Sequence, residues 1–243
     1  MASAPGAGRA AIILAAGHGS RLRPVAPVKP LVEVRGRTLL MHVLDALAAS
    51  GLARAIVVTG HAREAVEASL ADAPLPVEPV HNPDWATSAN GRSLLAARAH
   101  VVPGTLLLMG DHLVSSALVR RVIEAPDAPL VLAVDRRLGH PWVDEADVTR
   151  VRTLGTGAVR PIAAIGKTLL VYDALDTGVF RIGPALPGAL AARPDPTLSE
   201  GVAMLAGRGQ AMAVDTVGAP WLDVDDSRAL RLAQDQWPAV DAG

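Results

Sequence analysis

Residues 11–24 of this 243-residue chain read AIILAAGHGSRLRP, and KPL follows at residues 29–31. The first four residues form a short apolar run, which is typical of a strand buried on both faces. The small residues after it let backbone N–H groups approach a phosphate or the edge of a base closely. Two cations, Arg21 and Lys29, follow in the same segment, as a polyanionic ligand requires. The segment therefore predicts a buried strand that ends at a nucleotide-binding loop.

Two familiar phosphate-binding loops do not fit this segment. It lacks the Gly-Lys-Ser/Thr ending of a Walker A loop, and it lacks the third glycine of a dinucleotide fingerprint. On spacing alone, an ordinary strand and turn with surface cations remains an alternative.

Strand-like and helix-like segments alternate along the chain after this loop. Apolar runs predict further strands over residues 55–59, 77–80, 106–109 and 130–134. Helical spacing predicts helices over residues 38–50, 62–70, 91–100 and about 116–124. This alternation indicates an α/β fold with a Rossmann-like, three-layer and mostly parallel sheet. In such sheets ligands bind beyond the carboxyl ends of the strands, so we expect several strand-end loops to line one crevice.

The second part of the chain is less regular. Short strands are predicted over residues 148–151, 163–165 and 178–182, and another over 211–214. Helices are predicted over residues 199–206 and from Asp226 or Ser227, either of which can cap the helix, to about Gln236. No repeat or linker interrupts the chain.

Composition excludes several classes of protein. Half of the residues are hydrophobic, 19% are charged and the formal net charge is −1, so no basic excess points to nucleic acid or to a membrane surface. The chain has no cysteine, which excludes a disulfide scaffold, a thiol nucleophile and a Cys-ligated zinc site. No apolar run reaches the ~18 residues of a membrane span. We therefore expect a cytoplasmic protein.

The two lysines stand out among the cations. Of the 23 basic residues, 21 are arginine, and only Lys29 and Lys167 are lysine. A composition that favours arginine suggests that a position kept as lysine needs a compact ammonium group, although chance also explains two lysines.

Three aspartates are candidate metal ligands. Asp111 comes directly after the strand at 106–109, and Asp223 and Asp225 alternate within WLDVD at residues 221–225. If that segment is extended, both of its carboxylates point the same way. Carboxylate oxygens are the ligands that Mg²⁺ prefers. A turn aspartate at 111 and a solvated acidic turn at 223–225 remain the alternatives.

The pattern LAAGxGxRLxP followed by KPL resembles the signature of nucleotidyltransferases that activate sugar phosphates and related alcohol phosphates, the nucleotide-diphospho-sugar transferase type. The resemblance implies that the loop holds the nucleotide, that Arg21 contacts its β- and γ-phosphates, and that Lys29 binds the phosphate under attack. It also implies that Asp111, with Asp223 and Asp225, binds Mg²⁺. The nucleotide-binding residues implied in this way are Leu14, Ala15, Ala16, Gly17, Gly19, Arg21, Lys29, Asn90 and Ser93.

Later segments resemble cytidylyltransferases that act on inositol 1-phosphate or phosphocholine. The matching segments are residues 82–85, 90–94, 110–112, 143–151, 165–167, 176–178, 198–202 and 221–225. The resemblance implies that Lys167 binds the phosphate of the incoming substrate and that Asp176, Thr177 and Gly178 line its pocket. For Asn90 and Ser93, a turn followed by a helix cap is an equal alternative to nucleotide binding.

The implied reaction transfers CMP from CTP to a phosphorylated alcohol, such as inositol 1-phosphate, and releases pyrophosphate. It needs positioning and charge neutralisation by Arg21, Lys29, Lys167 and Mg²⁺ rather than a protein nucleophile. We expect residues 1–8 to be a flexible leader and 9–243 a single domain, with a nucleotide-binding half to about 135 and an acceptor-binding, metal-completing half after it. Alternatives are a uridylyl- or guanylyltransferase for a sugar or cyclitol phosphate, a phosphocholine or phosphonate cytidylyltransferase, and a non-catalytic nucleotide sensor.

Overall fold

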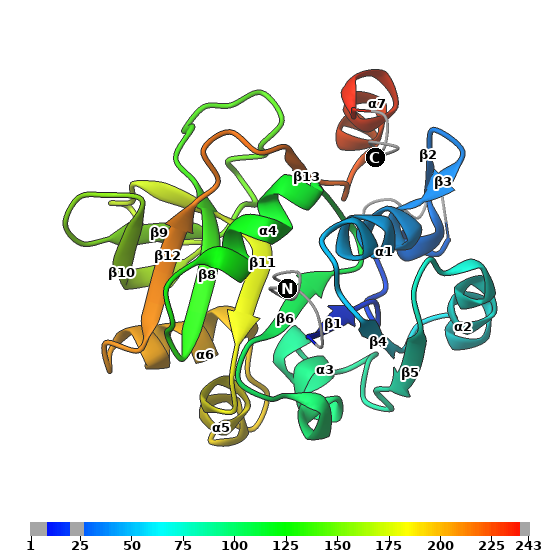
Figure 1. The fold of residues 1–243 in the computed structure, drawn as a ribbon, viewed down its shortest axis with the longest axis horizontal. Helices are drawn as coiled ribbons and strands as arrows, with labels where there is room; N and C mark the ends of the chain where they lie inside the picture. Colours follow the sequence, from blue (N-terminus) through cyan, green and yellow to red (C-terminus); the bar gives the residue numbers. More distant parts are fainter. Residues whose placement is uncertain (1–8, 20–26, 239–243) are drawn as a thin grey trace, which may run out of the picture.

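The computed structural model describes residues 9–19 and 27–238, and its centre is a nine-stranded sheet (Figure 1). The strands follow one another across the sheet in the order β5-β4-β1-β6-β11-β8-β12-β10-β9. The first four in this order pair in parallel, as the alternating sequence pattern predicted. They are β5 (Val77–His81), β4 (Arg54–Thr59), β1 (Ala10–Leu14) and β6 (Thr105–Met109).

The rest of the sheet is mixed. It contains β11 (Ala174–Ile182), β8 (Leu130–Asp135), β12 (Ala211–Asp215), β10 (Val159–Gly166) and β9 (Arg150–Thr153). Strands β11 and β10 run against the other strands of the sheet, because each pairs antiparallel with both of its neighbours. The predicted mostly parallel α/β class is therefore confirmed, and β11 is inserted between two strands, β6 and β8, that point the same way.

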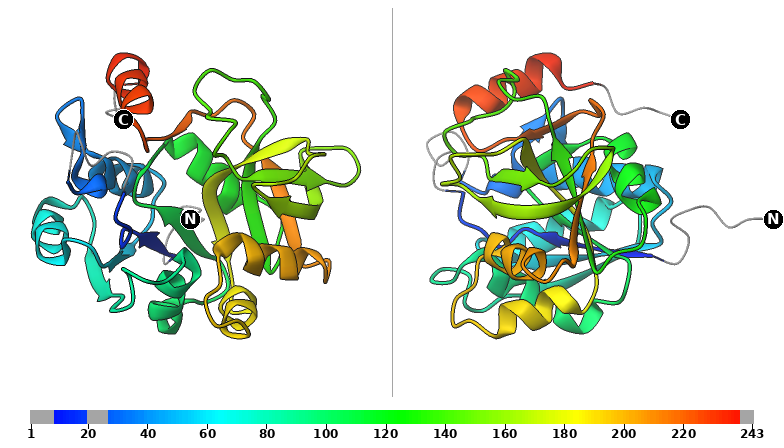
Figure 2. Two further views of the ribbon diagram at one scale, coloured as in Figure 1. Left: turned by 180° about the vertical axis from the view of Figure 1, so that it is seen from behind. Right: turned by 90° about the vertical axis from the view of Figure 1, so that its left-hand side faces the viewer.

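Helices cover both faces of the sheet, which gives the predicted three layers (Figure 2). One face packs against α1 (Leu39–Ala49), α2 (Arg63–Ser69) and α4 (Ser116–Glu124). The other packs against α3 (Asn90–Ala96), α5 (Ala185–Ala191) and α6 (Leu198–Ala206). Neighbouring residues of β1 show the alternation: Ile12 is buried in one core and Ile13 in the other.

Outside these three layers, a smaller group of elements lies at the end of the sheet where the parallel strands finish. It consists of β7 (His112–Val114) paired antiparallel with β13 (Trp221–Asp223), the hairpin of β2 (Glu33–Val34) and β3 (Arg37–Thr38), and α7 (Ser227–Gln236). Figure 1 shows α7 beside this hairpin. Its small core includes Val34, Leu113, Leu222 and Ala229. The pairing of β7 with β13 places Asp223 directly opposite His112.

The ends of the helices agree with the capping residues in the sequence. The side chains of Thr38, Ser115 and Asp226 accept hydrogen bonds from backbone N–H groups in the first turns of α1, α4 and α7. Of the two caps considered for the last helix, Asp226 is the one the structure uses. In the described part of the chain, no helix has the length and apolarity needed to cross a lipid bilayer.

Candidate active site

Three segments that are distant in the sequence meet at Lys29. Its ammonium group lies 2.7 Å from Asp111 Oδ2 and 3.4 Å from Asp223 Oδ1, although these residues are 82 and 194 positions away along the chain. Lys29 begins a short 3₁₀ turn, Asp111 follows β6 and Asp223 ends β13. Because Lys29 is 8% exposed, this is a nearly buried cation held between two carboxylates.

His112 completes this group. Its Nδ1 lies 2.8 Å from Asp111 Oδ1 and 3.6 Å from Asp223 Oδ1, and its ring stacks on Trp221. Burial alone would lower the pKa of His112, but the two carboxylates outweigh burial and raise it to about 9.

Burial and neighbouring charges also compete in setting the pKa values of Lys29 and Asp111. Burial opposes the charge of Lys29, and the carboxylates of Asp111 and Asp223 outweigh it, so the pKa of Lys29 is raised. Burial would raise the pKa of Asp111, but Lys29 and His112 hold it well below its usual range. Lys29, Asp111 and His112 therefore all favour their charged forms in the folded protein.

The donor atoms at this place fit a hard divalent cation. Two groups have ligand atoms within 4.8 Å of one another, Asp111 with His112 and Asp223, and Asp147 with Asp223 and Asp225. Five of the six contributions are carboxylate oxygens, which suit Mg²⁺. The structure thus brings the three predicted metal ligands together around Asp223.

Asp147 was not predicted to take part. It lies in the irregular segment between β8 and β9, where nothing in the local pattern separates it from Asp144 or Glu145. The segment 143–151 did carry a family resemblance, but no single position within it stood out.

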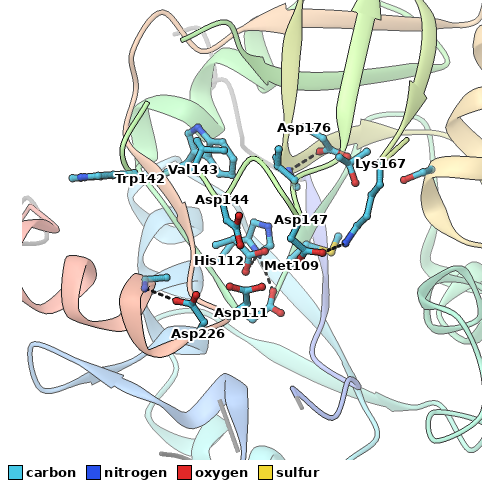
Figure 3. A pocket seen from close by; sticks show the side chains of 18 of the residues that line it. Met109, Asp111, His112, Trp142, Val143, Asp144, Asp147, Lys167, Asp176 and Asp226 are labelled. Carbon is cyan, nitrogen blue, oxygen red and sulfur yellow. Dashed lines mark hydrogen bonds and ion pairs between the residues drawn. The ribbon is translucent and has the colours of Figure 1, made fainter. Parts of the chain in front are cut away.

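A cavity of about 250 Å³ opens beside these carboxylates. Figure 3 shows side chains from both halves of the chain pointing into it. Lys167, which follows β10, shares its wall with Asp111 and Asp223. Other residues of the wall are Asn90, Met109, His112, Trp142, Asp144, Asp147, Asp176, Gly178, Trp221, Asp225, Asp226 and Arg228. Aspartates dominate this wall, so an anionic ligand needs bound cations to enter it.

Lys167 is paired in this structure. Its Nζ donates a hydrogen bond of 2.5 Å to Asp147 Oδ1, as Figure 3 shows. Both lysines of the chain are therefore paired with carboxylates that line the cavity, Lys29 with Asp111 and Asp223 and Lys167 with Asp147.

The predicted acceptor residues on β11 divide between two faces. Asp176 and Gly178 line the cavity. Thr177 is fully buried and its hydroxyl donates to Ala133 O, so its side chain does not reach the cavity. Gly178 has φ +76°, and a Cβ there would lie 2.9 Å from the His112 ring, so a larger residue would displace His112.

The loop after β1 packs against Lys29. Gly19 has φ +58°, and a Cβ at this position would lie 2.5 Å from Lys29 Cβ, so only glycine lets the loop lie this close. Ala15 and Ala16 are buried, whereas Gly17 is exposed. Leu14 O accepts a hydrogen bond from Gly110 N, which ties the ends of β1 and β6 together. Arg21 lies outside the described residues.

The two residues predicted from the loop after β5 differ in position. Asn90 lines the cavity, where its Oδ1 accepts a hydrogen bond from Leu198 N. Ser93 is buried inside α3, and its hydroxyl accepts a hydrogen bond from Asn82 Nδ2. Ser93 thus holds the loop in place rather than lining the cavity.

Asp176 gives a pH-dependent prediction. Burial raises the pKa of its carboxyl from 3.8 to about 6, although Gly178 N donates to Oδ1 and opposes the shift. The folded protein therefore binds this proton more tightly than the unfolded chain, so stability is lost as pH rises from about 4 through 6. We expect Asp176→Asn to be more stable than the wild type at pH 8 by on the order of 2 kcal/mol, and equally stable below pH 4. Urea unfolding across this range measures the difference, and a constant difference would contradict the assignment.

A cation–carboxylate cluster at the carboxyl ends of the strands of an α/β sheet, next to a glycine-containing loop, is the arrangement expected of a nucleotidyltransferase. The comparison with known families agrees with this class. The chain belongs to the MobA-like NTP transferase domain family, whose pattern matches residues 11–161.

Two proteins with assigned names are similar in sequence to this chain. The chain is 39% identical over 233 residues to a bifunctional IPC transferase and DIPP synthase of Rubrobacter xylanophilus, covering 94% of this chain and 52% of that protein. It is 40% identical over 131 residues to the CMP-5'-(3-aminopropyl)phosphonate synthase of Streptomyces rubellomurinus, covering 51% of this chain and 20% of that protein. The chain thus spans about half or less of the length of these relatives.

Solved structures support the fold. The inositol-1-phosphate CTP transferase from T. maritima superimposes with a TM-score of 0.80 at 23% identity, covering 96% of this chain and 99% of that one. A UDP-glucose pyrophosphorylase complexed with UDP-glucose superimposes with a TM-score of 0.78 at 13% identity, covering 93% and 97%. The nucleotide-diphospho-sugar transferase fold predicted from the sequence is confirmed.

Proposed function

We propose that this chain is a Mg²⁺-dependent cytidylyltransferase that transfers CMP from CTP to a phosphorylated polyol, with inositol 1-phosphate as the leading acceptor, and releases pyrophosphate. The observation that carries the proposal is that Lys29 and Lys167 each form an ion pair with carboxylates that line one cavity. Such an arrangement suits a reaction between two anions, because each anion meets its own ammonium group.

In this proposal Lys29 binds the α-phosphate of CTP. Its ammonium group is nearly buried and stays charged, so it offers a fixed positive charge where the attacking oxygen adds negative charge. The backbone of the loop from Leu14 to Gly19 holds the rest of the nucleotide, and Arg21 holds the leaving pyrophosphate.

Asp111, Asp223 and Asp225 would hold the Mg²⁺ ion, which neutralises phosphate charge during the displacement. Asp111 follows β6, and Asp223 and Asp225 lie at the end of β13, so these residues would hold the cation where the two segments meet. No side chain needs to act as a nucleophile, because the substrate phosphate oxygen attacks the α-phosphorus directly.

Lys167 binds the phosphate of the acceptor, and the wall formed by Asp176 and Gly178 receives the alcohol. A carboxyl group such as that of Asp176 hydrogen-bonds well to hydroxyl groups, which favours a polyol. We propose that the nucleotide-binding half of a single domain ends near residue 135 and that the acceptor wall comes from the later half. Since CTP is a compound of the cytoplasm, we place the reaction there.

Lys167→Ala tests the acceptor assignment. We expect the KM for the acceptor to rise at least ~10-fold while the KM for CTP changes less than ~3-fold, because one charge-assisted contact to the acceptor phosphate is lost. Steady-state rates with each substrate varied in turn measure both constants. Equal losses for the two substrates would argue against the role.

A substrate matrix tests the proposal as a whole. CTP, UTP, GTP and ATP are each combined with inositol 1-phosphate, glucose 1-phosphate, phosphocholine and 3-aminopropylphosphonate, and pyrophosphate release is measured with Mg²⁺ and with a chelator. The proposal predicts the highest rate for CTP with inositol 1-phosphate. The phosphonate is included because of the 40% identity to the Streptomyces protein. Faster turnover with UTP or GTP contradicts the base assignment, and no release from any pair contradicts enzymatic function.

A further inference from the structure

The ion pair between Lys167 and Asp147 lies beside the carboxylates of Asp223 and Asp225. Lys167 Nζ lies 2.5 Å from Asp147 Oδ1, and the Asp147 carboxylate lies within 4.8 Å of ligand atoms of Asp223 and Asp225. Figure 3 shows Asp147 between Lys167 and the group around Asp111. Asp147 therefore touches the acceptor lysine on one side and faces the metal carboxylates on the other.

This pair can rearrange easily. The side chain of Lys167 is 57% exposed, so its ammonium group keeps access to water when it turns away from Asp147. An ion pair exposed to this extent contributes little to stability. The Lys167 side chain can therefore turn toward a ligand.

The position of Asp147 creates a conflict for the acceptor. A phosphate that binds Lys167 brings negative charge next to a carboxylate that already accepts one of the three donors of the ammonium group. Like charges a few ångströms apart repel, and the repulsion is stronger in a cavity than in open water. In the absence of a cation, Asp147 thus disfavours phosphate at Lys167.

A divalent cation held by Asp223 and Asp225 would change this balance, because its positive charge would offset that of the neighbouring Asp147 carboxylate. The carboxylate would be drawn toward the cation, and the donor that Lys167 now gives to Asp147 would become available for a phosphate.

We propose that Asp147 is a positioning residue that makes phosphate binding at Lys167 dependent on a divalent cation at Asp223 and Asp225. The inference rests on the proposed function for the role of Lys167, but not for the identity of the base or the alcohol. By linkage, phosphate tightens cation binding by the same factor. The enzyme thus favours its acceptor only after the metal has bound.

Calorimetric titration of the whole chain with inorganic phosphate, with and without Mg²⁺, tests this coupling. We expect Mg²⁺ to tighten phosphate binding to the wild type on the order of tenfold. Asp147→Asn should bind phosphate without Mg²⁺ as tightly as the wild type does with it, and Mg²⁺ should change its affinity less than ~3-fold.

Two variants serve as controls. Asp144→Asn removes one negative charge from the same cavity wall and keeps an oxygen for the hydrogen bond from Ala146 N, so we expect the coupling of the wild type. Lys167→Met should lose the Mg²⁺-dependent phosphate binding, which places that binding at Lys167. Thermal unfolding confirms that each variant is folded.

Wild-type coupling that persists in Asp147→Asn overturns the inference, and so does loss of phosphate binding by that variant in both conditions. The reciprocal measurement needs no variant: Mg²⁺ affinity of the wild type that does not change with phosphate also overturns it. If the coupling is present but no nucleotide transfer occurs with any substrate pair, the proposed function fails and this inference stands. If transfer occurs without the coupling, the inference fails alone.

Discussion

Asp111→Asn is expected to lower kcat by at least ~100-fold at saturating CTP and Mg²⁺. In the proposed function Asp111 is a metal ligand, and in the structure it is the nearest carboxylate to Lys29, at 2.7 Å. An amide oxygen of the same size is a weaker ligand for a hard cation, and it leaves Lys29 with Asp223 at 3.4 Å as the nearer carboxylate. Pyrophosphate release at a series of Mg²⁺ concentrations measures both the loss of rate and the weaker metal binding.

Asp226→Asn is the matched control for this experiment. Asp226 lines the same cavity and caps α7, and asparagine caps helices equally well. The control removes one negative charge from the cavity wall without touching Lys29, so its kcat should stay within ~3-fold of the wild type. Normal turnover by Asp111→Asn would show that the metal assignment is wrong.

Lys29→Met is expected to lower kcat/KM for CTP by about 1,000-fold. The substitution keeps an apolar chain of similar length in a nearly buried position but removes the fixed charge. It also removes one of the two cations, Lys29 and His112, that contact the carboxylates of Asp111 and Asp223, which destabilises the free protein by about 3 kcal/mol. Mg²⁺ should therefore raise the Tm of Lys29→Met more than the Tm of the wild type.

Lys29→Arg separates the loss of catalytic rate from the loss of stability. It restores a positive charge, so most of the lost stability should return, but a planar guanidinium group does not replace a compact ammonium group between two carboxylates. The rate should stay low. Thermal unfolding with and without Mg²⁺, together with kcat/KM for CTP, measures both effects, and a fully active arginine variant would contradict the requirement for lysine.

Most of the parallel half of the sheet was predictable because its signals are local. The apolar run at residues 11–14 corresponds to β1, and the helical spacing over 38–50 corresponds to α1, which ends before Gly51. Helix α5 was missed because Pro187 and Gly188 lie inside it and weaken the helical pattern. The strand predicted at 148–151 begins at Arg150, because Val148 N is hydrogen-bonded to Asp144 O in a turn.

The shortest elements could not be predicted from sequence patterns. Strands β7 and β13 have three residues each, too few for a period to be recognised, yet their pairing brings Asp223 opposite His112. The motifs did identify Lys29, Asp111 and Asp223, which the structure brings together.

The direction in which single side chains point was harder to predict from the sequence than the segments that form the site. A period of two on β11 separates Thr177 from Asp176 and Gly178, so the strand pattern alone argues against Thr177 as a cavity residue. Nothing comparable was available for Asp147, whose position depends on contacts with segments 20 to 78 residues away along the chain. Long-range contacts of this kind are decided by the assembled fold.

The insertion of β11 between β6 and β8 also limits how the chain can be divided. A fragment that ends after β8 would contain both neighbours of β11 but not β11 itself, so the hydrogen-bonding edges of β6 and β8 would be bare. Bare apolar strand edges promote aggregation. Proteolysis in the segment between β8 and β9 should therefore yield two pieces that stay associated, and separate expression of the two pieces should yield insoluble material unless they are produced together.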